Sequence, residues 1–357
     1  MPWESRLEDR FDWSYLDDGP GDVEKRLDAW GQPFFPADAE MRGRGVSHDS
    51  HRMEPWDDRA EAPVLTELLP RSLALQPFRA LRDFRAVSET TIPAARRPMF
   101  DRPWYFFPDG ILSTLPLEML PDHADSGVRF GQNRAVTLCL RPRVPDGVRR
   151  PVDLDRGWLG LGDVPGTGEI PHLPGSGLEV REIRRFLQRH DYSCGQLLGT
   201  EARADRLAEE LEARRPAVLH LAVHGFADDT HPEACTLILA DCPERPEREL
   251  LPYRRIRQLP LDGVELVVLS ACSGLIGRSG RSASMEGLAW TFLGRGVTQV
   301  IASRYPVDDD ATVVLMLELY QGLLTMPVSD ALGRARDVCL VEKKLDPREV
   351  AAWSVWC

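Results

Sequence analysis

Residues 265–280 read ELVVLSACSGLIGRSG, an apolar run that leads directly into a cysteine and then into glycine, serine and arginine. A short, almost uninterrupted run such as 266–269 is typical of a strand buried on both faces in an α/β protein. Cys272 therefore lies where this strand should end. Because the carboxyl ends of parallel strands hold loops on a rigid scaffold, ligands and chemistry collect there. The position predicts a reactive thiol, with a small buried core cysteine as the alternative.

The rest of the chain alternates between strand and helix patterns. Apolar segments predict strands, and amphipathic segments predict the helices between them. The expected strands lie in 135–142, 158–162, 217–225, 265–272, 298–306 and 351–357, and the expected helices in 178–190, 200–216, 286–296, 311–324 and 328–344. Residues 103–120 have the composition of a hairpin, and Thr200 is the expected N-cap of its helix. This order predicts an α/β fold, an α/β/α sandwich with a mostly parallel central sheet.

Composition narrows the class of protein. The chain has 357 residues, 43% hydrophobic and 28% charged, with a formal net charge of -12. The acidic balance argues against direct binding of nucleic acid, and we find neither an apolar run of transmembrane length nor a secretory signal. Seven scattered cysteines without CxxC pairs indicate reduced thiols and a cytoplasmic protein with no membrane partner. We expect a poorly ordered or docking N-terminal extension over 1–75 and one domain over 76–357.

A histidine at a second strand end completes a possible catalytic pair. His224 and Gly225 end the apolar segment AVLHLAVHG, much as Cys272 and Gly274 end LVVLSACSG. A cysteine needs a neighbouring base because the thiolate is the nucleophile, and histidine has a suitable pKa and can later protonate the leaving amine. His224 precedes Cys272 by 48 residues (272 − 224), close to the spacing in caspases. We therefore predict that both side chains lie at one edge of one sheet.

Several motifs occur together in the order of a known family. HLAVHG and SACSG, followed by SMEGLAWTFLGRGVTQVIASRYPVDDDATVVLMLELYQGLL, resemble the CHAT domain, a branch of the caspase-like cysteine peptidases that also includes separase and the metacaspases. Upstream, PDGILSTLPLEMLP, WLGLGD, LPGSGLEVREI and LLGTEA continue the resemblance, which covers residues 78–357. The resemblance implies a caspase-like fold and a peptidase that acts on protein or peptide substrates without a cofactor or metal. It also implies a bacterial setting in stress, defence or regulated cell death.

The resemblance assigns roles to particular residues. His224 matches the catalytic histidine and Cys272 the nucleophile, while Gly225 and the backbone N–H of Cys272 match the oxyanion hole. The segment 301–306 resembles the strand along which these enzymes bind an extended peptide. The substrate-binding residues expected there are Ser303, Arg304, Tyr305 and Asp308, although the family commonly has an aliphatic residue and a tryptophan where Arg304 and Tyr305 stand.

Other readings of the same residues stay open. A zinc site could use His220 and His224 with His231, Cys235 or Cys242, but the spacing matches no common zinc motif, and His220 is better explained by packing inside the sheet. GLGDVPG lacks the third glycine of a dinucleotide-binding loop, so nucleotide binding is not favoured.

Acidic residues near the site also have two explanations. Asp228 and Asp229 could orient the histidine, although a turn accounts for them at least as well. Residues 308–310, all aspartates, could form a pocket for a basic substrate residue or cap the next helix, and the cap is favoured. The loop 277–284, GRSGRSAS, is expected to gate activity, with Arg278 and Arg281 as cleavage points.

The sequence thus predicts a cysteine endopeptidase with a His224–Cys272 dyad, latent until a signal or a protein partner acts through the N-terminal extension. A catalytically silent caspase-like scaffold is the alternative.

Overall fold

The computed structural model of the chain describes residues 104–107, 117–119, 131, 135–139, 147–166, 172–226, 235–240, 250–270, 286–304 and 307–357. The expected extension 1–75 lies outside these residues, so the predicted domain boundary stays a prediction. None of the helices in the described ranges is long and apolar enough to cross a membrane.

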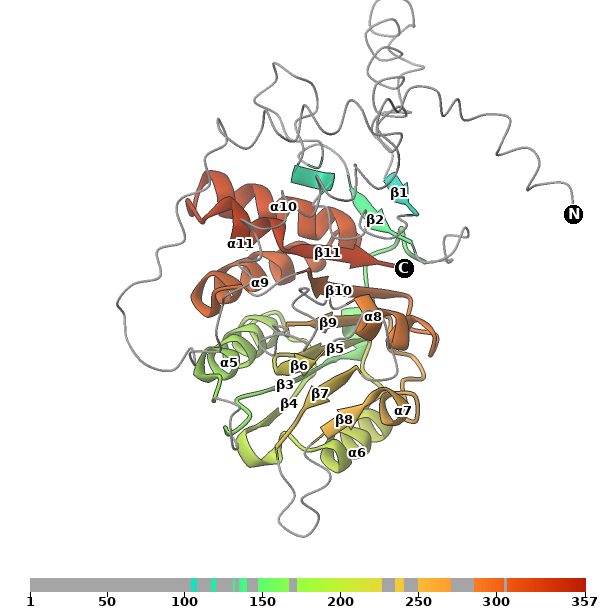
Figure 1. The fold of residues 1–357 in the computed structure, drawn as a ribbon. Helices are drawn as coiled ribbons and strands as arrows, with labels where there is room; N and C mark the ends of the chain where they lie inside the picture. Colours follow the sequence, from blue (N-terminus) through green and yellow to red (C-terminus); the bar gives the residue numbers. More distant parts are fainter. Residues whose placement is uncertain are drawn as a thin grey trace, which may run out of the picture.

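An eight-stranded sheet forms the centre of the molecule (Figure 1), with strands in the order β1-β2-β11-β10-β9-β5-β3-β4. Its strands are β1 (Trp104–Phe106), β2 (Val136–Leu138), β3 (Trp158–Gly162), β4 (Cys194–Leu198), β5 (Val218–Leu221), β9 (Leu266–Leu269), β10 (Gln299–Ser303) and β11 (Trp353–Trp356). Strands β10, β9, β5, β3 and β4 are parallel, and β11 is antiparallel to β10 and parallel to β2, which is parallel to β1. The mostly parallel sheet is confirmed.

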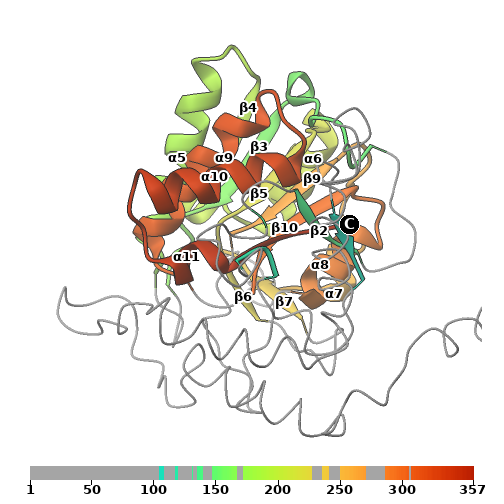
Figure 2. The same ribbon diagram turned by 90° about the horizontal axis from the view of Figure 1, so that it is seen from above.

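Helices cover both faces of this sheet (Figures 1 and 2). One layer contains α5 (Pro174–Gln188), α9 (Asp309–Leu323), α10 (Val328–Val341) and α11 (Pro347–Ala351). The other contains α6 (Ala204–Arg214), α7 (Tyr253–Ile256), α8 (Glu286–Leu293) and a second sheet of β6 (His224–Phe226), β7 (Thr236–Ile238) and β8 (Leu250–Pro252). Single 3-10 turns occur at Leu117–Met119, Leu154–Arg156 and Gly199–Glu201. The expected α/β/α sandwich is therefore confirmed.

Strand β9 shows why its sequence lacks polar alternation. Leu266 and Val268 pack in the core with α5, α9 and α10, while Val267 and Leu269 pack in the core on the opposite face. All four side chains are fully buried. A strand covered on both faces needs apolar residues at every position, which is the pattern observed.

Glycine at position 160 leaves room for a neighbouring ring. In β3, the indole of Trp158 turns along the strand, and a Cβ added at Gly160 would lie 2.1 Å from its Cη2 atom. A contact that short is far inside the van der Waals separation of two carbons. The small residue thus permits the buried tryptophan to fill the space beneath α5.

Two expectations about local structure are wrong. The helix after Thr200 begins at Ala204, with Arg203 as its N-cap and Gly199–Glu201 forming a 3-10 turn before it. The helix expected over 178–190 begins four residues earlier, at Pro174, and ends at Gln188. Strand β1 pairs in parallel with β2, and residues 108–116 of the expected hairpin lie outside the described residues, so the hairpin stays a prediction.

Candidate active site

The carboxyl ends of three adjacent strands are aligned with one another. Leu221 of β5 pairs with Leu269 of β9, and Leu269 pairs with Ala302 of β10. We call these three residues the register row. His224 follows Leu221 by three positions in the sequence, and Cys272 follows Leu269 by three. Cys272 itself lies outside the described residues.

His224 does not belong to the central sheet, which corrects one expectation. The apolar segment 217–225 divides: β5 ends at Leu221, and His224 begins β6, which pairs with β7 in the second sheet. The break occurs at Ala222, whose N–H donates to the carbonyl of Leu161 on β3 at 2.8 Å. His224 is 7% exposed, and Gly225 pairs with Leu237. The histidine is therefore held by a short strand that leaves the central sheet at its carboxyl edge.

A buried polar network lies beneath this edge, and we call it the Glu179 network. The carboxylate of Glu179, on α5, accepts a hydrogen bond from Ser270 Oγ at 3.0 Å and lies 2.9 Å from Nε2 of His220. That second contact has the distance of an ion pair but not the alignment of a hydrogen bond. Nδ1 of His220 lies 3.1 Å from the hydroxyl of Tyr320, which accepts a hydrogen bond from Nε1 of Trp158 at 2.9 Å. The network joins β3, β5, β9, α5 and α9.

Burial determines the protonation of Tyr320. Desolvation raises the pKa of its phenol well above the usual value, and the nearby Glu179 carboxylate raises it further, against the opposing effect of the hydrogen bond from Trp158. The phenol therefore keeps its proton, and its hydroxyl lies within hydrogen-bond distance of Nδ1 of His220. The expectation that His220 packs inside the sheet is confirmed, because its side chain is fully buried.

Sequence reasoning missed Glu179, Ser270 and Tyr320. One signal was present for Glu179, which lies four residues before Ile183 and eight before Leu187 and so shares their buried helix face. A carboxylate on that face requires a partner inside the protein. Ser270 lies two residues before Cys272, and His220 four before His224, so the network reaches both chain segments that carry the predicted dyad.

The predicted substrate strand ends in a second buried cluster, which we call the Glu118 cluster. Arg304 Nη1 and Nη2 donate to the two carboxylate oxygens of Glu118 at 3.1 and 3.2 Å, and Arg336 Nη2 donates to Glu118 Oε1 at 2.7 Å. Arg304 also donates to the carbonyls of Ala351 and Trp353. Burial alone would raise the pKa of the Glu118 carboxyl, but the two guanidinium groups outweigh it and lower the pKa.

The other predicted substrate residues have different surroundings. Ser303 is 1% exposed and pairs with Trp353 of β11. Asp308 is the N-cap of α9, and its Oδ1 accepts from the backbone N–H groups of Asp310 and Ala311 at 3.0 and 3.1 Å. The favoured capping role is therefore confirmed, and neither bond uses Oδ2. Tyr305 lies outside the described residues.

The described residues do not bring a metal site together. Within those ranges, no group of three or more histidine, cysteine, aspartate or glutamate side chains is arranged to hold an ion. His220 instead contacts Glu179 and Tyr320, and Cys235 is fully buried in the core. His231 and Cys242 of the zinc hypothesis, Asp228, Asp229 and the loop 277–284 all lie outside the described residues.

Comparisons with known proteins agree with the class that this fold defines. The family model of the CHAT domain matches residues 73–356, so the chain belongs to the CHAT domain family. Family membership confirms the resemblance seen in the sequence, and with it the caspase-like fold class. No curated protein matches the chain.

Two solved structures are similar in part. The crystal structure of the Arg-specific cysteine proteinase gingipain R (RgpB) aligns with a TM-score of 0.41 and 9% identity, over 67% of this chain and 56% of that one. The chain thus spans little more than half the length of that proteinase. The complex of the Porphyromonas gingivalis RgpB pro- and mature domains aligns with a TM-score of 0.44 and 11% identity, over 94% of this chain and 75% of that one.

Proposed function

We propose that the protein is a cysteine endopeptidase that cleaves protein substrates with Cys272 as nucleophile and His224 as general base. The observation that carries this proposal is the register row, together with the equal three-residue spacing from it to His224 and to Cys272. Parallel strands bring their carboxyl ends to the same edge of a sheet, so the segments that follow Leu221 and Leu269 both start at that edge. A thiol and an imidazole at that edge are the pair that acyl transfer needs.

The proposed reaction has two stages. The imidazole of His224 accepts the thiol proton of Cys272 as the sulfur attacks the scissile carbonyl, and the N–H groups of Gly225 and Cys272 stabilise the oxyanion. The imidazolium then protonates the amine leaving group, and a thioester remains. Water, deprotonated by His224, attacks this thioester and releases the carboxylic acid product and the thiol. No metal or cofactor enters these steps.

The substrate is proposed to bind beyond the paired part of β10. Residues Gln299–Ala302 pair with β9, and Val300–Ser303 pair with β11, so an extended peptide cannot be added along these positions. The guanidinium of Arg304 is directed into the Glu118 cluster, and its backbone N–H donates to the carbonyl of Ala352 at 2.7 Å, which leaves its carbonyl as the proposed contact. Tyr305 and Oδ2 of Asp308 complete the proposed set, the latter as a partner for a basic substrate residue.

The activity is proposed to be latent until a protein partner or signal acts, with residues 1–75 as the docking segment. We place the protein in the bacterial cytoplasm, in stress or defence signalling. Both statements derive from the family resemblance and the composition.

Cleavage of a mixed peptide library, with new termini read by mass spectrometry, tests the proposal. We expect Cys272→Ala to abolish cleavage and His224→Ala to lower its rate about 10²- to 10⁴-fold, because general base catalysis is lost. Cys194→Ala and His190→Ala, at part-buried and exposed positions away from the register row, are matched controls that should keep full activity.

Alkylation by iodoacetamide separates latency from the absence of a dyad. If His224 activates the thiol, Cys272 should react at least about tenfold faster at pH 7 in the wild type than in His224→Ala. Fast alkylation without cleavage would indicate a formed but latent site. Equal alkylation rates together with no cleavage would overturn the proposal and favour the silent scaffold.

A further inference from the structure

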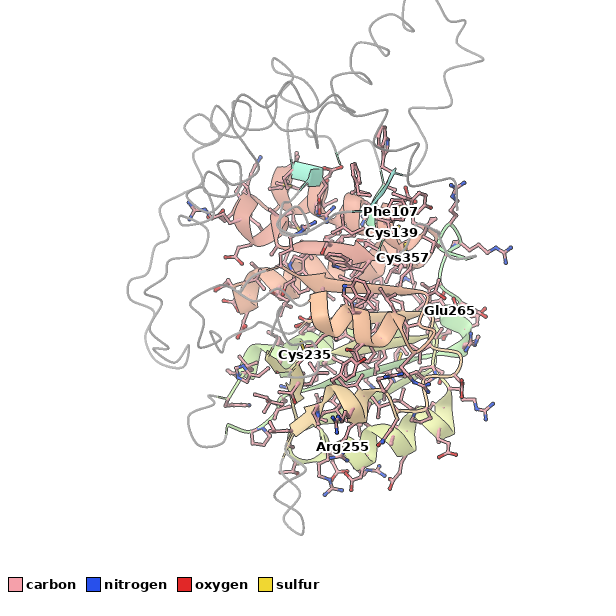
Figure 3. The ribbon with its side chains drawn as sticks, turned by 45° about the vertical axis from the view of Figure 1, so that its right-hand side comes forward. Phe107, Cys139, Cys235, Arg255, Glu265 and Cys357 are labelled. Atoms are coloured by element: carbon pink, nitrogen blue, oxygen red, sulfur yellow. The ribbon has the colours of Figure 1, made fainter. Side chains whose placement is uncertain are left out.

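We propose that Cys139 and Cys357 are a redox modification site, joined by a reversible disulfide when a peroxide is present. The two sulfur atoms lie 2.8 Å apart and are both buried, at 2% and 7% exposure of their residues. Figure 3 shows the two side chains next to each other at one end of the sheet. They are separated by 218 positions in the sequence, so only the fold brings them together.

Strand pairing holds the two cysteines in place. Cys139 directly follows β2 and Cys357 directly follows β11. The two strands are parallel, with Leu138 paired to Trp356, and the N–H of Cys357 donates to the carbonyl of Leu138 at 2.8 Å. The two backbones therefore run alongside each other at the level of the thiols, which is the arrangement that a disulfide requires.

The pair differs chemically from the other buried thiols. A hydrogen bond from Cys357 lowers the pKa of the Cys139 thiol despite its burial, and the same interaction raises the pKa of Cys357. By contrast, burial raises the pKa of Cys194 to about 11 and that of Cys339 to about 12. Cys139 is therefore the sulfur that becomes a thiolate first, and the thiolate is the form that peroxide oxidises.

The reaction balances with a peroxide as the oxidant. The Cys139 thiolate attacks one oxygen of hydrogen peroxide, the O–O bond breaks, and a sulfenic acid and hydroxide form. The sulfur of Cys357 then attacks the sulfenic sulfur, the S–O bond breaks, and water leaves as the S–S bond forms. In total, two thiols lose two electrons and two protons, and one peroxide is reduced to two waters.

The disulfide would link β2 and β11, the two neighbouring strands of the central sheet with the fewest register pairs. The pairing of β11 with β2 has a single register pair, whereas every other neighbouring pair has three to five. Such a junction opens more readily than a long ladder, which gives peroxide access to the buried thiols. A covalent link there would hold β1 and β2 against the rest of the sheet.

The thiols lie away from the proposed catalytic edge. Strand β11 is antiparallel to β10, so that Trp356 pairs with Val300 near the start of β10, while Ser303 at its end pairs with Trp353. The proposal therefore does not depend on peptidase activity, and its test can succeed or fail independently of that activity.

The first experiment uses the full chain, reduced and then treated with one equivalent of hydrogen peroxide. After blocking with N-ethylmaleimide, we expect the intact mass of the major species to show two unblocked cysteines and a loss of 2 Da at that pair. Digestion with trypsin should yield peptides 135–143 and 349–357 linked to each other, because each contains one cysteine. Dithiothreitol should reverse the link.

Variants and a second measurement complete the test. Cys139→Ser and Cys357→Ser should each lose the linked peptide, while the matched variant Cys194→Ser keeps it. Amide hydrogen exchange in residues 104–106, 136–138 and 353–356 should slow about tenfold or more in the oxidised form, because local opening is suppressed. Full blocking of both cysteines, oxidation of Cys139 to a sulfinic acid without a link, or linkage to other cysteines would overturn the proposal.

Discussion

The two halves of the central sheet are stabilised in different ways. The parallel half, β4, β3, β5, β9 and β10, has ladders of four or five register pairs, and its buried polar groups form the Glu179 network with a single carboxylate. The reversed half consists of β11, β2 and β1, and β11 and β2 share one register pair. The Glu118 cluster, with one carboxylate and two guanidinium groups, binds the carbonyl of Trp353 on β11. The parallel half is thus held by long strand ladders and a network with one carboxylate, whereas the reversed half has a short junction beside a buried cluster of three charges.

The largest effect should come from removing the carboxylate of the Glu118 cluster. Glu118→Ala removes the carboxylate that contacts both buried guanidinium groups, those of Arg304 and Arg336, which should cost about 3–5 kcal/mol in the free energy of unfolding. Urea denaturation measures this loss. The matched control Glu209→Ala removes a largely exposed partner of Arg206 and should change stability by less than about 0.5 kcal/mol. Equal losses in the two variants would contradict the contrast between the halves.

A smaller effect is expected in the Glu179 network. Tyr320→Phe leaves Nε1 of Trp158 and Nδ1 of His220 without their hydroxyl partner, at a cost of about 1–3 kcal/mol. The control Tyr192→Phe removes a hydroxyl from a part-buried position and should be within about 0.5 kcal/mol of the wild type. If Tyr320→Phe lowers the free energy of unfolding as much as Glu118→Ala does, neutral hydrogen bonds and buried charges contribute equally to stability.

Alkaline pH should weaken the parallel half through the same tyrosine. The pKa of Tyr320 is raised in the folded protein, mainly by burial, so above about pH 10 the unfolded chain loses this proton while the folded chain keeps it. Stability should then fall as the pH rises above about 10, because the unfolded state binds fewer protons. Urea midpoints from pH 8 to 11 should decline more steeply in the wild type than in Tyr320→Phe. If the urea midpoint falls equally steeply with pH in both proteins, Tyr320 is not the source of the loss of stability.

The smallest effect concerns the N-cap of α9. Asp308→Ala removes the acceptor of two backbone N–H groups and should cost about 1 kcal/mol, whereas Asp308→Asn, which keeps a side-chain oxygen, should cost less. Thermal unfolding measures both. If Asp308→Asn is as stable as the wild type but no longer cleaves beside basic residues, the Asp308 carboxylate binds the substrate in addition to capping α9. Unchanged cleavage in that variant would remove Asp308 from the proposed substrate set.

The difference between the halves also explains what could be predicted from the sequence. Strands β3, β5, β9 and β10 and the helices between them follow from local apolar patterns, because each strand is buried on both faces. The break at Ala222 was not predicted, since an apolar run gives no sign of where a strand leaves one sheet for another. In place of the single strand expected over 217–225, the structure has two strands, β5 and β6.

Predicting the candidate site was limited by contacts between distant segments. Arg304 and Glu118 are 186 residues apart, and Ser270 and Glu179 are 91 apart, so no local pattern reveals either pair. The assignments of His224 and Cys272 came from strand ends and a family resemblance, which depend on local sequence. Arg304 is an example. Its position on the predicted substrate strand suggested that its side chain contacts substrate, but its guanidinium is buried.

The register row has a consequence for how related genes can diverge. Leu221 and Leu269 are fixed to each other by the sheet, and three residues lead from each of them to His224 and to Cys272. Substitutions within these short segments preserve their length, whereas a codon inserted into or deleted from one of them would displace one residue of the proposed dyad and not the other. We expect any codon inserted or deleted between Leu269 and Cys272 to abolish the proposed cleavage, because it would shift Cys272 and leave His224 in place.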